Sequence, residues 1–154
     1  MTASLKLKSE TLRELYDHYL SLSDEVPHEK QIDPSSFPSK LFPYICLFEV
    51  VPESNRYFAK LVGNALIHYA KHDYRNQFLD ELPTYNRLGR VVDWYQSCLK
   101  ERRPAAGFIN FVCDGDVELP AERLFLPFVN DDNEIRKFIV AISIQNDGIN
   151  HALP

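Results

Sequence analysis

Residues 123–144 read RLFLPFVNDDNEIRKFIVAISI, and this stretch decides the fold class. Two apolar runs, 123–129 and 135–144, flank the pentapeptide NDDNE, whose residue types are those of a chain reversal. The run 135–144 is apolar on both alternating faces over much of its length, which is typical of a strand buried inside a sheet. We therefore expect two strands joined by a turn, with the second strand in the centre of the sheet.

A second reversal precedes these strands. Residues 108–113 have the pattern of a strand, and Asp114-Gly115 is a favoured type I′ turn that leads into a strand continuing through 123–129. The last third of the chain is therefore predicted to be a three-stranded antiparallel meander. Residues 146–154 have the composition of a polar tail.

The first half of the chain carries another predicted hairpin. Residues 44–51 and 57–62 are rich in β-forming types, and the PESN sequence between them suits a tight turn. In the second run Tyr57, Ala59 and Leu61 share one face, while Lys60 marks the other face as the wetter one. Tyr57, Ala59 and Leu61 are expected to face the core.

Helical patterns lie between the two predicted hairpins. Residues 65–69 and 78–82 suit short helices, and from Thr84 to Pro104 apolar residues recur at helical spacing, at positions 88, 91, 92, 95 and 99. Hairpins at both ends with helices in the middle indicate an α+β domain, in which an antiparallel sheet is covered by helices on one face.

An extra helix is predicted near the N-terminus, between Ser9 and Pro27. Its apolar residues repeat at seven-residue spacing in two offset rows. This stripe either packs on the protein's own sheet or pairs with a second copy. The residues of the candidate homodimer interface are Leu12, Leu15, Tyr19 and Leu22.

Length and composition exclude several classes of protein. A chain of 154 residues suits one domain, and its net charge of −5 with scattered basic residues argues against nucleic acid as a partner. It has no apolar run long enough to span a membrane. Three cysteines without metal-ligand spacing, and no signal-peptide pattern, indicate a reduced, cytoplasmic protein.

Four motifs occur in an order that resembles a known family: IDP at 32–34, LFPYI with FEV at 41–50, FAKLVGN at 58–64, and ERLFLPF at 122–128. Together with the element order, they resemble a family of small bacterial single-domain PAS proteins over about residues 10–145. The resemblance implies a five-stranded antiparallel sheet with helices on one face, plus the N-terminal helix outside it or at a dimer interface. Residues 1–26 then form the N-terminal helix region, 27–145 the PAS-like domain and 146–154 the tail.

The resemblance also implies a function. PAS domains sense small ligands or bind partner proteins and do not catalyse, and 154 residues leave no length for an effector domain. We therefore expect a stand-alone sensory or regulatory module in bacterial signalling, which binds a signalling protein and a small apolar ligand and needs no cofactor. The sequence departs from the family pattern at Lys71, which stands where the family tends to have a glycine and is soon followed by Asp73-Tyr74-Arg75-Asn76. A ligand shared by the family therefore cannot be assigned to this chain.

The expected ligand site is an apolar pocket between the sheet and the short helices. Sequence alone leaves open whether these side chains line a cavity or fill the core. The candidate lining residues are Tyr57, Leu61, Ile67, Phe78, Leu82, Tyr95 and Asn110.

Metal, haem and flavin sites have little support. His68 and His72 share a helical face beside Asp73, but Tyr69 stands where the zinc-protease pattern needs glutamate. His68 is also the one candidate haem ligand near the helices, and there is no CxxCH motif. Light-sensing PAS domains carry a reactive cysteine in a GxNCR-like helix, whereas this chain has Gly63-Asn64-Ala65. We expect no metal site.

Two alternative functions remain at this point. One is a small α+β enzyme whose His and Asp side chains act as acid and base in the pocket, although no nucleophile motif or Gly-rich phosphate loop is present. The other is a ligand-free scaffold with a filled core. The enzyme would require His68, His72 or Asp73 to lie inside the pocket.

Overall fold

The computed structural model describes residues 5–51, 53–85, 89–113 and 117–145. Its centre is a five-stranded antiparallel sheet with strand order β2-β1-β7-β6-β3. The strands are β1 (Ile45–Val51), β2 (Arg56–Val62), β3 (Ala105–Phe108), β6 (Ala121–Val129) and β7 (Ile135–Ile144). The predicted α+β class is confirmed, and β7 is central, because its two apolar faces both need cover.

The strand predicted at 108–113 is divided in the structure. β3 begins earlier, at Ala105, and ends at Phe108, and the chain then forms β4 (Phe111–Val112), which pairs with β5 (Glu118–Leu119) in a separate two-stranded ladder. The amide of Ile109 donates to the carbonyl of Ala121 at 3.1 Å between the two ladders. We call the β4–β5 pair the flap. The predicted Asp114-Gly115 turn lies outside the described residues.

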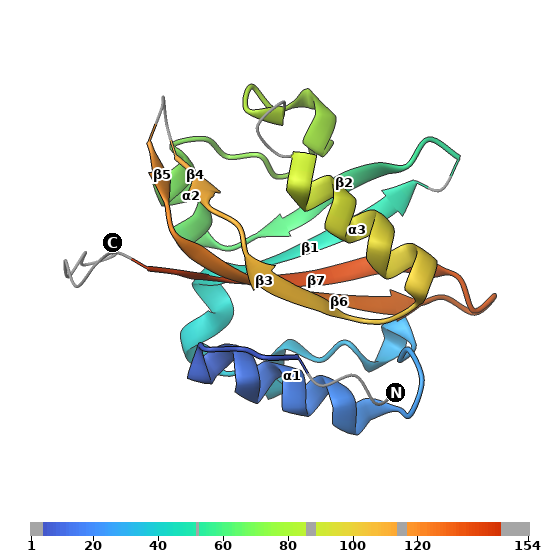
Figure 1. The fold of residues 1–154 in the computed structure, drawn as a ribbon. Coiled ribbons are helices and arrows are strands. Elements are labelled where there is room, and N and C mark those ends of the chain that lie inside the picture. Colours follow the sequence, from blue (N-terminus) through green and yellow to red (C-terminus); the bar gives the residue numbers. More distant parts are fainter. Residues whose placement is uncertain (1–4, 52, 86–88, 114–116, 146–154) are drawn as a thin grey trace.

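The predicted central helices lie on one face of the sheet (Figure 1). They are α2 (Asn64–Ala70), the 3-10 turn η4 (Leu79–Glu81) and α3 (Gly89–Glu101). Tyr95 of α3 anchors this layer, because its ring lies 5.1 Å from both Phe125 and Phe138 and 5.5 Å from Phe48, measured between centroids. These edge-to-face contacts attach α3 to three neighbouring strands.

The N-terminal helix covers the opposite face (Figure 1). α1 (Glu10–Leu22) begins at Ser9, whose side chain accepts from the amide of Leu12, and it is followed by three 3-10 turns: η1 (Glu29–Gln31), η2 (Pro34–Ser36) and η3 (Ser39–Tyr44). Asp33 caps η2 with Pro34 at its first position, and both residue types are favoured at these places. Both faces of the sheet therefore carry helices.

The side chains predicted to form a homodimer interface are instead part of the core. Leu12, Leu15 and Tyr19 are fully buried against β6 and β7 of their own chain, and Leu22 is half-buried at the edge of the same cluster. The alternative of packing on the protein's own sheet is therefore correct, and the interface assignment to these four residues is wrong. A Leu15→Asp substitution would therefore affect the folding of the chain rather than the association of two copies.

A β-bulge changes the face that Leu61 presents. Leu47 pairs with Leu61, but the next residue of β1, Phe48, pairs with Ala59, so Lys60 is the extra residue. After the bulge the alternation is reversed: Val62 is buried, while Leu61 is 58% exposed. The prediction that Leu61 faces the core is therefore wrong, whereas Tyr57 and Ala59 do face it.

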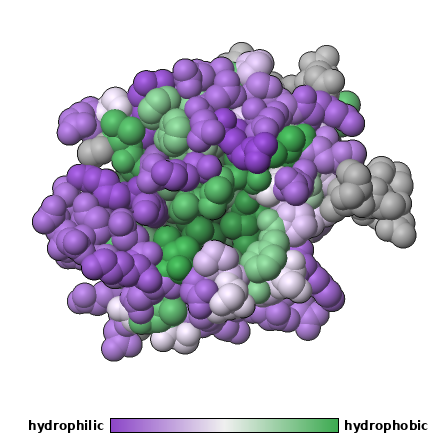
Figure 2. Space-filling model, turned by 180° about the vertical axis from the view of Figure 1, so that it is seen from behind, coloured by the Kyte–Doolittle hydropathy of each residue, from purple (hydrophilic) through white to green (hydrophobic). Residues whose placement is uncertain are grey.

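The face of the sheet that α1 covers is not covered evenly. α1 lies over β6, β7 and η3 rather than over β1 and β2, and Leu61 stays exposed there. Figure 2, the view from behind, shows apolar side chains that gather in a hollow surrounded by polar ones. Among the described helices, none combines the length and the apolar composition needed to cross a bilayer.

Candidate functional site

On the face of the sheet that carries α2 and α3, side chains fill one end and leave a hollow at the other. The aromatic cluster around Tyr95 fills one end, and a cavity of about 430 Å³ lies beside it. Strand alternation presents Cys46 and Phe48 from β1, Val140 and Ile142 from β7, and Arg123 from β6 to this cavity. Sequence patterns give no sign of this difference, because apolar side chains that line a cavity and those that fill a core are of the same types.

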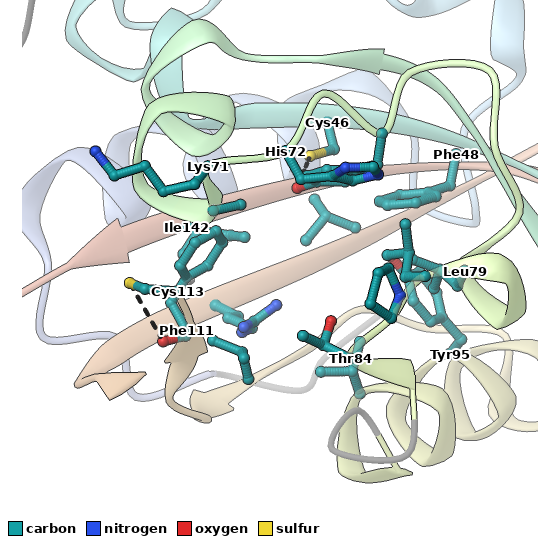
Figure 3. A pocket seen from close by; sticks show the side chains of 18 residues that line it. Cys46, Phe48, Lys71, His72, Leu79, Thr84, Tyr95, Phe111, Cys113 and Ile142 are labelled. Atoms are coloured by element: carbon teal, nitrogen blue, oxygen red, sulfur yellow. Dashed lines mark hydrogen bonds between the residues drawn. The ribbon is translucent and has the colours of Figure 1, made fainter. Parts of the chain in front are cut away.

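The remaining walls come from the segments that cross the sheet and from the flap. In Figure 3, Cys46 lies across the cavity from Thr84, while Phe111 and Cys113 lie at one end. The wall residues outside the sheet are Ala70, Lys71, His72, Tyr74, Leu79, Leu82, Pro83, Thr84, Val91, Tyr95, Phe111, Val112 and Cys113. The cavity is thus mainly apolar with a few polar groups, as is usual for small-molecule sites.

Arg123 is the one charged side chain that is buried among the described wall residues. The residue is 6% exposed, its Nε donates to the carbonyl of Ile109 at 3.3 Å, and its Nη2 donates to the carbonyl of Asn110 at 3.1 Å. Both carbonyls belong to the link between β3 and β4, so Arg123 also holds the flap against the sheet. Burial lowers the pKa of the guanidinium, yet an arginine stays charged in proteins.

The neutral polar groups near Arg123 do not supply a counter-charge. The thiol of Cys46 lies 3.8 Å from the hydroxyl of Tyr74, and both residues are buried. Burial raises the pKa of Cys46 to about 12 and raises the pKa of Tyr74 well above its usual value. Both side chains therefore stay neutral at pH 7, and in the described part of the chain no aspartate or glutamate belongs to the wall.

The edge of the cavity carries two more basic side chains. Lys71 ends α2 in a left-handed conformation with φ of 58°, and His72 follows it, so that both side chains lie on one loop at the edge (Figure 3). Both are exposed, and His72 Nε2 lies 2.8 Å from the side-chain oxygen of Gln77. Lys71, which departs from the family pattern, thus stands beside the cavity.

Two of the seven side chains that sequence analysis assigned to the pocket lie on its wall, namely Leu82 and Tyr95. Tyr57 is buried behind the wall, stacked on Tyr95 with 4.5 Å between ring centroids. Phe78 lies outside, 5.1 Å from the ring of Phe58 and under the guanidinium of Arg56. Ile67 is half-buried away from the cavity, Leu61 is exposed by the bulge, and Asn110 is exposed and donates to Glu118.

Arg123 is not among the site residues predicted from the sequence. The sequence feature that could have indicated it is the pair Glu122-Arg123 at the start of an otherwise apolar strand. Because side chains alternate along a strand, these two charged residues lie on opposite faces of the sheet. A charge pair at a strand end usually lies in solvent. Here helices and loops cover both faces, so both side chains are buried.

The acid–base side chains that the enzyme alternative requires do not lie inside the cavity, and of the three only His72 reaches its edge. His68, His72 and Asp73 are all exposed, and a bidentate contact with Arg75 lowers the pKa of Asp73 to about 2. A carboxyl group with that pKa is a weak base at neutral pH. Within the described residues, no group of three metal-ligating side chains is found.

Two tyrosine hydroxyls in the core provide a matched test of these contacts. The hydroxyl of Tyr19 donates to the carbonyl of Pro127 at 2.7 Å, whereas the buried hydroxyl of Tyr57 has no hydrogen-bond partner in the described part of the chain. We expect Tyr19→Phe to lower the free energy of unfolding by about 1–2 kcal/mol, and Tyr57→Phe to leave it unchanged or raise it by up to about 1 kcal/mol. Urea denaturation of both variants measures the difference, and equal losses would contradict the two environments.

Comparisons with known proteins identify the fold. No protein-family model and no curated protein matches the sequence. Among solved structures, a fungal LOV domain photoreceptor matches with a TM-score of 0.54 and 8% identity, covering 89% of this chain and 95% of the other.

Two further structures agree. The PAS domain of a protein from Colwellia psychrerythraea has a TM-score of 0.52 and 9% identity over 70% of this chain and 92% of its own. The LOV domain of the blue-light photoreceptor Aureochrome1 has a TM-score of 0.52 and 8% identity over 70% of this chain and 85% of its own. At such identities the likeness concerns the fold alone. The chain has the PAS/LOV fold, as the sequence resemblance predicts.

Proposed function

We propose that this chain, with its PAS fold, is a sensory domain that binds a small molecule in the cavity between the sheet and the α2–α3 segment. The observation that carries the proposal is the cavity itself. Its volume of about 430 Å³ falls in the range of small-molecule sites, and its wall combines apolar side chains with few polar ones. A domain with only a structural role would be stabilised by filling this space.

The flap offers a route from ligand to partner protein. It supplies Phe111 and Val112 to the cavity wall, beside the adjoining Cys113, and its base is tied to β6 through the carbonyls that Arg123 binds. A ligand that contacts these side chains better in one flap position shifts the population toward that position. In this proposal a signalling protein recognises the shifted surface.

We place the domain in the cytoplasm, because Cys46, Cys98 and Cys113 are free thiols and all three are buried. Free, unpaired cysteines are usual in reducing compartments. The enzyme alternative loses support here, since His68 and Asp73 lie outside the cavity wall and His72 is exposed at its edge.

A cavity-filling variant tests ligand binding. Ile142 lines the cavity, so Ile142→Phe is expected to abolish binding while the domain stays folded. Native mass spectrometry of the purified wild-type chain should show a bound small molecule, or a small-molecule thermal-shift screen should raise the melting temperature. A ligand concentration of a hundred times Kd raises the free energy of unfolding by about 2.7 kcal/mol. For a domain of this size, that raises the melting temperature by roughly 5–10 °C.

Ile144→Phe is the matched control. Ile144 lies two residues further along the same strand and is not in the cavity wall, so this variant should respond to ligand as the wild type does. The polypeptide mass alone, together with no thermal shift from any compound, would favour the ligand-free scaffold instead.

A further inference from the structure

The charge of Arg123 has no counter-ion in the described part of the chain. All described salt bridges lie elsewhere and are partly exposed, and the adjacent Glu122 is directed to the other face, where it accepts the amides of Lys8 and Ser9. Taking a charge out of water is costly unless it is paired. A guanidinium that is more than nine-tenths buried beside an empty volume therefore points to a negatively charged ligand group.

The hydrogen bonds of Arg123 leave a defined part of the guanidinium available. The carbonyls of Ile109 and Asn110 occupy Nε and Nη2, which form one edge of the planar group. A guanidinium has five N–H donors, so the end formed by Nη1 and the second hydrogen of Nη2 is unused among the described contacts. Two parallel N–H groups match the two oxygens of a carboxylate.

The surroundings limit the ligand further. The wall next to Arg123 is formed by apolar side chains such as Phe48, Val140 and Phe111, which suit an apolar body. Among the described wall residues only one cation is buried, and Lys71 at the edge is exposed, so the buried charge matches one carboxylate rather than a doubly charged phosphate. None of the described wall residues is acidic, so none of them would repel an anion.

We propose that the cavity takes a small monocarboxylic acid with an aromatic or aliphatic body, whose carboxylate binds the free end of the Arg123 guanidinium. This inference rests on the proposed function and names the chemical class of its ligand. Bound in this way, the acid neutralises the buried arginine, and its body contacts the flap residues at the cavity end. The ligand therefore acts on the same side chain that holds the base of the flap.

The test compares acids with their uncharged amides on the full chain. The probes are phenylacetate, 3-phenylpropionate and octanoate, each against the corresponding primary amide, with affinity measured by calorimetry and thermal shift. At least one acid is expected to bind at least tenfold more tightly than its amide, because a hydrogen bond to a charged group adds about 1.5–3 kcal/mol. Arg123→Met should remove this preference for the acid while the amide binds as before.

Arg103→Gln is the matched control, because this arginine is half-exposed, lies outside the wall and should not affect the preference. If Arg123→Met does not fold, Arg123→Lys keeps the charge without the paired donors and should reduce the preference. Equal binding of acids and amides, or an equal loss of both in Arg123→Met, would overturn the ligand class and leave the sensory function standing. If no probe binds, the class is also overturned, and the sensory function itself fails only if the broader screen and native mass spectrometry are negative as well.

Discussion

Replacing Gly63 with alanine is expected to destabilise the domain by about 3 kcal/mol or more, the largest effect we predict for a single methyl group. Gly63 joins β2 to α2, and a Cβ there would lie 2.2 Å from the carbonyl oxygen of Pro43 and 2.9 Å from that of Phe42. Its φ of −62° is ordinary, so the glycine is required by the close approach of two backbone segments. The alanine would also strain the 2.8 Å hydrogen bond from the Gly63 amide to Ile45.

Gly107 provides the comparison for this prediction. A Cβ at Gly107 would lie 2.0 Å from Cη2 of Trp94, which is a side-chain atom and can be removed. We expect Gly107→Ala to be partly rescued in the double variant with Trp94→Leu, as shown by a double-mutant cycle in urea. At Gly63 the clash is with backbone atoms, so no side-chain deletion can relieve it. If the free energy of unfolding of Gly63→Ala lay within about 0.5 kcal/mol of the wild-type value, the backbone at Gly63 would have to be further from the backbone at Pro43.

Glu122→Ala is expected to lower the free energy of unfolding by about 3–4 kcal/mol. The carboxylate is 1% exposed, and its two oxygens each accept a backbone amide at 2.7 Å, from Lys8 and from Ser9. These bonds attach the start of α1 to β6, and each hydrogen bond to a charged group contributes about 1.5–3 kcal/mol. Glu122→Gln, which keeps one acceptor, should lose about half as much.

Urea denaturation measures the loss at Glu122, and hydrogen exchange shows where it acts. In Glu122→Ala the amides of α1 should exchange faster than those of β7, because the attachment of the helix is weakened first. Glu14→Gln is the surface control, since Glu14 is exposed on α1 and its change should stay within about 0.5 kcal/mol. A Glu122→Ala protein as stable as this control would contradict the role of the carboxylate as an anchor.

Local patterns were enough to predict most elements. Ser9 begins α1, the 52–55 segment joins β1 to β2, and the apolar run at 135–144 is the central strand. Each of these features depends on residues close together in the chain, through capping, turn chemistry or alternation. Their order along the chain in turn indicated the PAS fold.

The errors concern residues whose position depends on a distant partner. Leu61 is turned outward because β2 gains Lys60 as an extra residue against β1, and pairing register is not visible in one strand alone. The stripe of Leu12, Leu15 and Tyr19 suits a second helix as well as a sheet, and only the fold shows which of them covers it. An apolar stripe on a helix indicates that this face of the helix must be buried, but it does not indicate which surface buries it.

The fold class, the element order and the central strand follow from local sequence patterns, because periodicity, caps and turns are properties of neighbouring residues. The site depends on how distant segments pack. Arg123 and Glu122 are adjacent in sequence, yet Arg123 lines the cavity and Glu122 is buried under α1. They separate because successive side chains of a strand lie on opposite faces of the sheet, and at this position both faces are covered. Whether a surface encloses a cavity depends on how closely separate layers approach, and no local pattern carries that information.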